Sequence, residues 1–180
     1  KFYYHLNPFF SLNLKLVCLK YHMRKFLFII MTIIPLFVYS EPIDKGYNAY
    51  QKNDYMNAYN FWKDDANKGN AVSQFNLALL YFFGKGVEQN LEKAFFYCSL
   101  SANQGLARAQ NNLAHMYYKG VGVGQNYVES YKWAYLARKN GYLSQKILND
   151  SSINLTEAMR IEANKRIHEF LLGKNDYEKQ

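Results

Sequence analysis

The stretch AVSQFNLALLYFFGKGVEQNLEKAFFY, residues 71–97, returns 36 residues later as ARAQNNLAHMYYKGVGVGQNYVESYKW, residues 107–133. Alanine, glutamine, leucine, tyrosine, glycine, valine and asparagine recur at matching positions, and Gly69, Gly105 and Gly141 mark the same period. A fixed period of this length is the signature of a repeat protein, in which one supersecondary unit is copied along the chain. The fold is therefore decided by this unit and by the way its copies stack.

The spacing of small and apolar residues within one copy indicates two helices. Ala71, Leu77 and Tyr81 lie on one stripe of a helix with 3.6 residues per turn. Gly84 follows where a left-handed C-terminal cap favours glycine, and a second helix is expected over residues 91–104. The positions assigned to this structural repeat are Ala71, Leu77, Ala78, Tyr81, Gly84, Gly86 and Ala94 in one copy and Ala107, Leu113, Ala114, Tyr117, Gly120 and Gly122 in the next.

A hairpin with two apolar faces cannot bury both by itself, so the copies must stack side by side. The sequence thus predicts an all-α domain over residues 41–180, an α-solenoid of stacked antiparallel helix hairpins closed by a C-terminal capping helix. Its hairpins are expected at about 43–68, 71–104 and 107–140, and its capping helix at about 155–172. Asn154 or Thr156 is expected to provide the N-cap of that last helix.

The segment MRKFLFIIMTIIPLFVYS, residues 23–40, has the pattern of a secretory signal peptide, with a basic pair before an apolar run and small residues at its end. Cleavage is predicted between Ser40 and Glu41, and residues 1–22 are interpreted as sequence upstream of the true start. The 14-residue apolar run would be about 21 Å long as a helix, shorter than a hydrocarbon core of about 30 Å. We therefore expect a periplasmic or secreted protein without stable membrane insertion after cleavage.

The net charge of +8 does not indicate nucleic-acid binding, because it is concentrated before the repeats. Residues 41–180 hold 17 basic and 14 acidic side chains, a net charge of only +3. Cys18 and Cys98 lie on opposite sides of the predicted cleavage site, so the expected mature chain has a single cysteine and no disulfide framework.

Catalytic and metal-binding signals are missing from the sequence of the expected mature chain. Its histidines, His115 and His168, and its cysteine have no spacing typical of a metal site, and no phosphate-binding loop is present. The prediction is a protein that is not an enzyme, with no catalytic residues, metal or cofactor.

The pattern A-x-x-Q-x-x-L-A-x-x-Y-x-x-G-x-G-V-x-Q-N-x-x-x-A-x-x-Y resembles the repeat of the Sel-one-like repeat (SLR) family. The resemblance covers the copies at 69–104 and 105–140 and implies a tetratricopeptide-like α-solenoid, here in an exported form. Cysteine-rich secreted members have been associated with β-lactam binding or hydrolysis, which a chain with Cys98 alone is not expected to share.

The resemblance also implies that the free side of each first helix faces a concave groove. Once the residues that pack in the stack are excluded, the opposite side of each first helix remains available for binding. The partner-binding residues are therefore predicted to be Val72, Phe75, Leu79, Phe82, Phe83, Arg108, Asn111, His115, Tyr118 and Lys119. The function predicted from these features is an exported, non-enzymatic interaction scaffold that binds a peptide or partner protein. The alternative is a receptor for cell-wall glycan or a small molecule that uses the many aromatic side chains.

Overall fold

The computed structural model describes residues 44–143 and 145–177, with side chains up to residue 173. The predicted signal peptide, its cleavage site and the residues before it lie outside this part of the chain. Among the described helices, none is long and apolar enough to cross a membrane.

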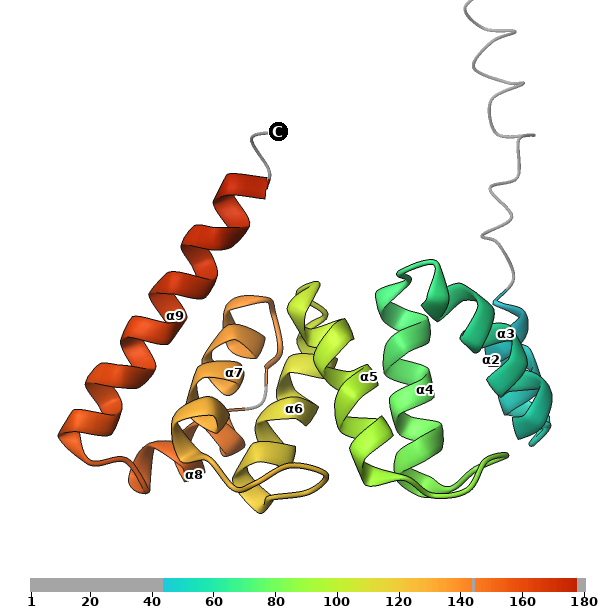
Figure 1. Cartoon of the computed structure of the whole chain (residues 1–180), viewed down its shortest axis with the longest axis horizontal. Helices are drawn as coiled ribbons and strands as arrows, with labels where there is room; N and C mark the ends of the chain where they lie inside the picture. The colour runs from blue at the N-terminus through green and yellow to red at the C-terminus, as the bar shows by residue number, and fades with distance from the viewer. Residues whose placement is uncertain (1–43, 144, 178–180) are drawn as a thin grey trace, which may run out of the picture. The chain divides into compact units, whose positions relative to one another are not determined.

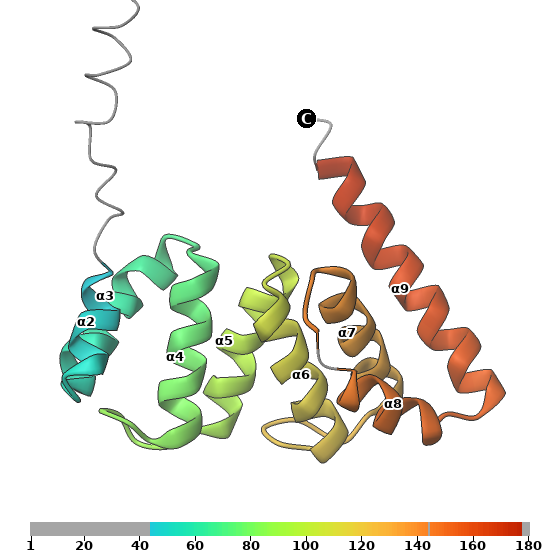
Figure 2. The ribbon, with the colours of Figure 1, turned by 180° about the vertical axis from the view of Figure 1, so that it is seen from behind.

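Every regular element between residues 44 and 177 is an α-helix, and the helices follow one another in a row (Figure 1, Figure 2). They are α2 (Lys45–Gln51), α3 (Tyr55–Asn67), α4 (Ala71–Phe83), α5 (Leu91–Asn103), α6 (Ala107–Lys119), α7 (Tyr127–Lys139), α8 (Lys146–Ile153) and α9 (Glu157–Tyr177). Helices α2 with α3, α4 with α5 and α6 with α7 form hairpins, and α3 packs on α4 and α5 on α6. The all-α solenoid predicted from the sequence is confirmed.

Recurring residues begin and end the helices of the repeat. Asn90 and Asn126, one period apart, each accept a hydrogen bond from the backbone N–H three residues on, at 2.8 and 3.0 Å, and so cap α5 and α7. Gly84 and Gly120 end α4 and α6 in the left-handed conformation, with φ of 66° and 69°. These caps explain why asparagine and glycine recur at a fixed period.

The second glycine of each loop lets the loop press on the hairpin before it. Gly86, with φ of +70°, lies so close to Tyr55 at the start of α3 that an added Cβ would come within 2.6 Å of its backbone. Gly122, with φ of +69°, meets the carbonyl of Leu91 at the start of α5 in the same way. Consecutive hairpins are thus joined by a close contact that only glycine permits.

Buried glutamines join one hairpin to the next by hydrogen bonds. The side-chain amide of Gln74 donates to the carbonyl of Ala66 at 3.2 Å, and that of Gln110 donates to the carbonyl of Ala102 at 3.1 Å. Each bond adds a side-chain donor to a carbonyl in the last turn of the preceding helix, which also accepts a backbone N–H from the turn that follows.

Small residues hold the helices close together in the core. Ala78 on α4 and Ala114 on α6 are buried, and so is Leu113. Because an alanine adds little thickness to a helix, its neighbours can pack directly against the backbone. Their recurrence 36 residues apart is the packing basis of the repeat.

Helix α8 continues the stack, although no helix was predicted at this position. Its buried residues Ile147, Leu148 and Ser151 lie 37 residues after Gln110, Asn111 and Ala114, which are the buried residues of α6 at the equivalent positions. The chain has therefore shifted by one residue relative to the period of 36, so the repeat pattern is lost while the burial pattern persists.

Helix α9 covers the exposed side of α7. Its N-cap is Thr156, whose hydroxyl accepts a hydrogen bond from the N–H of Met159 at 3.3 Å. Ala163 and Ile167 are buried, and the Phe170 ring meets Trp133 of α7 edge to face at 5.2 Å. The helix is the capping element that the amphipathic pattern predicted.

One carboxylate ties α9 to α7. Glu129, whose side chain is only 13% exposed, is 2.8 Å from the guanidinium of Arg166 on α9 and 2.7 Å from the ammonium of Lys132. It also accepts a hydrogen bond from the indole of Trp133 at 3.1 Å. Burial alone would raise the pKa of Glu129, but the hydrogen bonds from Lys132 and Arg166 outweigh it and hold that pKa below its usual value.

Candidate functional site

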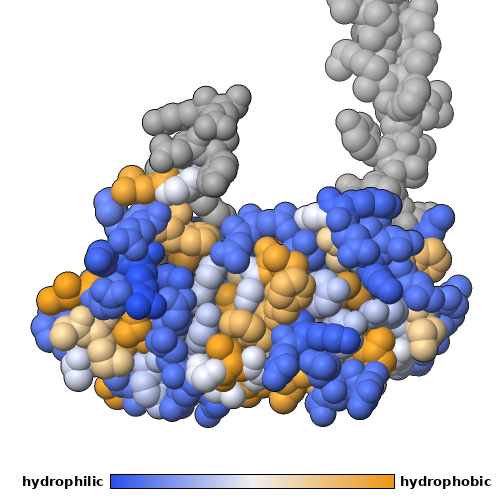
Figure 3. All heavy atoms as spheres, viewed as in Figure 1, coloured by the Kyte–Doolittle hydropathy of each residue, from blue (hydrophilic) through white to orange (hydrophobic). Residues whose placement is uncertain are grey.

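A groove runs between α4 and α6, the first helices of the two middle hairpins, with α5 behind it. Hydrophobic side chains gather over α5 and α6 in the middle of the face seen in Figure 3. Two hollows make up the groove, and Leu79 lines both of them.

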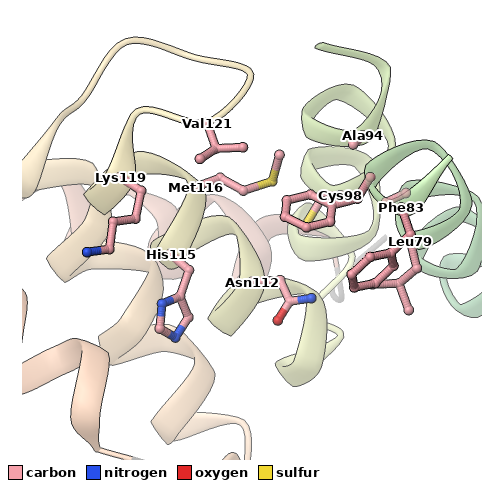
Figure 4. Close-up of a pocket in the computed structure, with 11 residues that line it drawn as sticks. Leu79, Phe83, Ala94, Cys98, Asn112, His115, Met116, Lys119 and Val121 are labelled. Carbon is pink, nitrogen blue, oxygen red and sulfur yellow. The ribbon is translucent and has the colours of Figure 1, made fainter. Parts of the chain in front are cut away.

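The first hollow, which we call the apolar cavity, lies at the C-terminal ends of α4 and α6 and has a volume of about 220 Å³. Leu79 and Phe83 stand on one side and His115 and Lys119 on the other, with Cys98 behind (Figure 4). Its lining consists of Ala78, Leu79, Phe82, Phe83, Ala94, Cys98, Asn112, His115, Met116, Lys119 and Val121.

The second, which we call the mixed hollow, lies at the N-terminal ends of the same helices and has a volume of about 560 Å³. It combines apolar side chains of α4 with polar groups and with the turns before α6 and after α7. Its lining consists of Val72, Phe75, Asn76, Leu79, Gly105, Leu106, Ala107, Arg108, Asn140, Gly141 and Tyr142.

Most residues predicted to face the groove line one of the two hollows. In the apolar cavity these are Leu79, Phe82, Phe83, His115 and Lys119, and in the mixed hollow they are Val72, Phe75, Leu79 and Arg108. Phe83 is 59% exposed, so part of its ring is open to a ligand at the edge of the apolar cavity. Asn111 and Tyr118 line neither hollow.

Asn111 is buried, with 5% of its surface exposed, so its prediction as an accessible binding residue is corrected. The prediction assumed that one stripe of each first helix packs and the other stripe is free. Helix α6, however, packs against α5, α7 and α8, which leaves a narrower free face than α4 has.

Tyr118 supports a groove residue instead of lining the groove. Its ring is half-buried and meets Tyr127 edge to face at 5.5 Å, and the ammonium of Lys119 lies over it, 5.1 Å from its centre. This cation–π contact stabilises the Lys119 side chain at the mouth of the apolar cavity.

Several lining residues were missed by sequence reasoning. On α6 they are Asn112 and Met116, which follow Arg108 by four and eight residues and so share its face. Reading the stripe in steps of four from Arg108 would have found both. Ala94, Cys98 and Val121 also line the cavity, but they come from α5 and the following loop, and a pattern within one helix does not contain them.

With the geometry of the groove described, the repeats can be compared with known proteins. A family model described as Sel1 repeat matches residues 71–106 and 107–142. The chain carries two Sel1 repeats. Their boundaries coincide with the hairpins α4–α5 and α6–α7, each with the turn that follows it.

Two solved structures of bacterial proteins match the chain. One is a protective antigen of uropathogenic Escherichia coli that displays an SLR fold, with a TM-score of 0.66 and 27% identity over 70% of this chain and 28% of that one. A Sel1 repeat protein from Oxalobacter formigenes matches with a TM-score of 0.48 and 30% identity over 49% of this chain and 35% of that one. The chain thus spans about a third of the length of these proteins. Among curated proteins, no sequence matches it.

The groove between the Sel1 repeats has a basic character. Arg108 and Lys119 lie at its two ends, about 16 Å apart along α6 at about 1.5 Å per residue. No aspartate or glutamate is found among the residues that line the two hollows. An anionic or acidic partner is therefore favoured over a basic one.

His115 lies midway along this basic edge. Partial burial lowers the pKa of His115, and the charges of Lys146 and Lys119 act in the same direction, against the pull of Asp150. The imidazole is therefore neutral at neutral pH and can accept or donate one hydrogen bond at the cavity mouth.

Cys98 forms part of the cavity floor of the first Sel1 repeat. Burial raises the pKa of its thiol to about 12, and the S–H group donates to the carbonyl of Ala109 at 3.3 Å. A thiol in this environment is not ionised at neutral pH and so does not act as a nucleophile. In the described residues, no group of three or more histidine, cysteine, aspartate or glutamate side chains is arranged to hold a metal ion.

Proposed function

We propose that this Sel1-repeat chain is a non-enzymatic scaffold that binds a peptide segment of a partner protein in the groove between α4 and α6. The observation that carries the proposal is the apolar cavity, with the exposed ring of Phe83 on one side and the ammonium of Lys119 on the other. Exposed apolar surface rimmed by polar groups is typical of a protein interaction site.

The chemistry of the groove supports binding over catalysis. Its one side chain that titrates near neutral pH is His115, and its thiol, that of Cys98, is held in the neutral form by burial. A general base without a nucleophile or an oriented second group lacks the arrangement that acyl or phosphoryl transfer needs.

The proposal includes export, and this part rests on the sequence. The segment 23–40 has the basic start, apolar run and small final residue of a signal peptide, so the repeats would act in the periplasm or outside the cell.

Site-specific photocrosslinking tests the proposal. A photoreactive phenylalanine analogue replaces Phe83 in the groove or, as the matched control, Phe96 on α5, which is 55% exposed and lines neither hollow. We expect one defined protein to crosslink at position 83 and not at position 96, in cells that export the chain. Crosslinking confined to position 96, or no protein adduct at either position, would contradict the proposal.

The glycan alternative has less support, because many tyrosine rings are engaged with other rings. Tyr81 stacks on Tyr97 at 5.7 Å, and Tyr59 meets Tyr81 edge to face at 6.0 Å while their hydroxyls lie 3.1 Å apart. Rings paired in this way are not free to stack on a sugar. Saturable binding of the chain to purified peptidoglycan would favour the alternative.

A further inference from the structure

We infer that the apolar cavity is a pocket for a single aromatic side chain of the partner, carried by an acidic peptide segment whose carboxylate reaches Lys119. This inference rests on the proposed function and specifies the partner by its chemistry. It is derived from the size of the cavity, from the residues that create it and from the charges at its edge.

The volume of the cavity limits the size of the group that can bind in it. An engineered cavity of about 150 Å³ accepts benzene, whereas sites for drug-sized molecules span about 300–1,000 Å³. The cavity, at about 220 Å³, lies between these limits. It therefore has room for one aromatic ring and too little room to enclose a larger ligand.

The cavity exists because small residues stand at its back. Ala94 and Cys98 of α5 are both buried. One period before Cys98 the chain has Trp62, a buried side chain that fills the corresponding position on α3. Trp62 thus distinguishes the hairpin before the first Sel1 repeat, where a large ring stands in place of the small side chain at the back of the cavity.

The walls of the cavity suit a ring. Phe82 and Phe83 meet edge to face at 5.0 Å on α4, and Met116 supplies a thioether on the α6 side. Aromatic rings favour offset or edge contacts with other rings and with sulfur. An inserted ring would cover part of Phe83, which water otherwise surrounds.

The charges at the groove define the rest of the segment. Lys119 stands at the cavity mouth, its ammonium held over the Tyr118 ring. Arg108 lies about 16 Å further along α6, in the mixed hollow. No carboxylate lines either hollow, so the charged side chains that acidic residues of the segment meet in the lining are Lys119 and Arg108.

Peptide display against the full chain tests this inference. We expect the selected peptides to share one aromatic residue with aspartate or glutamate beside it. Changing that aromatic residue to alanine in the best peptide should weaken binding at least tenfold. A free aromatic amphiphile such as phenylpropionate, tested as the small-molecule occupant, should compete only weakly.

Variants of the chain then locate the site. Val121→Phe, which fills the cavity, and Lys119→Gln, which removes its charge, should each weaken the peptide at least fivefold. The matched controls are Val123→Phe, half-buried in the same loop, and Lys139→Gln, exposed on α7, neither of which lines a hollow. Circular dichroism verifies that each variant is folded.

The outcomes separate this inference from the proposed function. Peptides that crosslink to position 83 but lack an aromatic residue, or that bind Val121→Phe at full strength, would overturn the pocket and leave the groove as the binding site. Peptides that are basic would overturn the charge assignment. A selection that yields no peptide at the groove would overturn both. Tight, saturating binding of phenylpropionate by a chain that selects no peptide would likewise overturn both and would make the cavity a small-molecule site.

Discussion

Gly122 and Gly124 lie two residues apart in the loop after α6, yet only the first has to be glycine. Gly122 has φ of +69° and touches the start of α5, whereas no heavy atom lies within 4 Å of a Cβ built on Gly124. Gly122→Ala should lower the free energy of unfolding by about 1–3 kcal/mol, because a side chain there is both strained and in collision. Urea denaturation of the wild type and the variant measures this decrease in the free energy of unfolding.

The control for this prediction is Gly124→Ala, for which we expect a change within about 0.5 kcal/mol. Equal effects of the two substitutions would mean that the loop does not press on the preceding hairpin.

His115 should make binding of an acidic peptide depend on pH. Its pKa is below the ordinary value of about 6.5, so the imidazole becomes charged only as the pH falls below that value. The charged groups around it are Lys119 on its own helix and Lys146 and Asp150 on α8. Protonation adds one positive charge, so affinity should rise about two- to fivefold as the pH falls from 7.5 through the lowered pKa of His115.

Isothermal titration calorimetry with the selected acidic peptide measures this rise. The rise should vanish in His115→Gln and persist in His168→Gln, since His168 is exposed on α9 and lines neither hollow. A rise that survives in His115→Gln would assign the pH dependence to another group.

At the level of helices, Glu129 is expected to fix α9 on α7. Glu129→Gln removes the charge that pairs with Arg166 and Lys132 and should destabilise the fold by about 1–3 kcal/mol at pH 7. Because the folded-state pKa of Glu129 is lowered, its contribution is fully present above about pH 4.5 and is lost as the pH falls through that lowered pKa.

Thermal unfolding at pH 7 and pH 3 measures this effect, and the difference between the wild type and Glu129→Gln should shrink at the lower pH. The control is Glu169→Gln, an exposed residue whose ion pair with Lys165 is 4.0 Å long and should contribute little. A gap between wild type and Glu129→Gln that is the same at both pH values would contradict the role of the carboxylate charge.

The packing of α6 gives a second prediction for a helix. Ala114 is fully buried, and the Ser130 hydroxyl of α7 donates to its carbonyl at 2.8 Å. Ala114→Leu should therefore overpack the contact and cost about 1–3 kcal/mol, measured by urea denaturation. Ala158→Leu, exposed on α9, should be nearly neutral, and a neutral Ala114→Leu would mean that the helices meet elsewhere.

The helices of the two repeats could be predicted from the sequence because their residues have the same physical task in both copies. Asn90 and Asn126 cap, Gly84 and Gly120 end a helix, and Gln74 bonds back to the previous hairpin. Helix α8 was not predicted, because the one-residue shift removes the recurring residue types from the expected positions. Ile147 and Leu148 nevertheless occupy buried positions equivalent to those of α6.

The binding face was harder to predict for a different reason. Asn111 is buried because α6 packs against α5, α7 and α8, and the floor of the cavity comes from the neighbouring helix α5. Only assembly of the stack brings these residues together, so the period along one helix contains no signal for them.

For the chain as a whole, the segment 23–40 leads to a prediction of processing. Because its apolar run is too short to span a membrane comfortably, the exported protein should begin at Glu41 and remain in the soluble fraction. N-terminal sequencing and intact mass after expression in an exporting bacterium identify the first residue of the mature chain. Ser40→Trp, which places a bulky residue at the cleavage site, should yield the uncleaved chain.

Recovery of a wild-type species that retains residues 24–40 and sediments with membranes would show that the segment is an anchor. The groove could still bind its partner in that case, so this outcome bears on location alone.

The loops that contain Gly86 and Gly122 allow the hairpins to dock in the order in which they are synthesised. Each loop rests on the first residue of a helix that precedes it in the chain, Tyr55 for Gly86 and Leu91 for Gly122. As the polypeptide emerges from a ribosome or an export channel, the surface that a loop needs has therefore already emerged. Each hairpin can dock the moment it is complete, so the nascent protein need not wait for its C-terminus to begin folding.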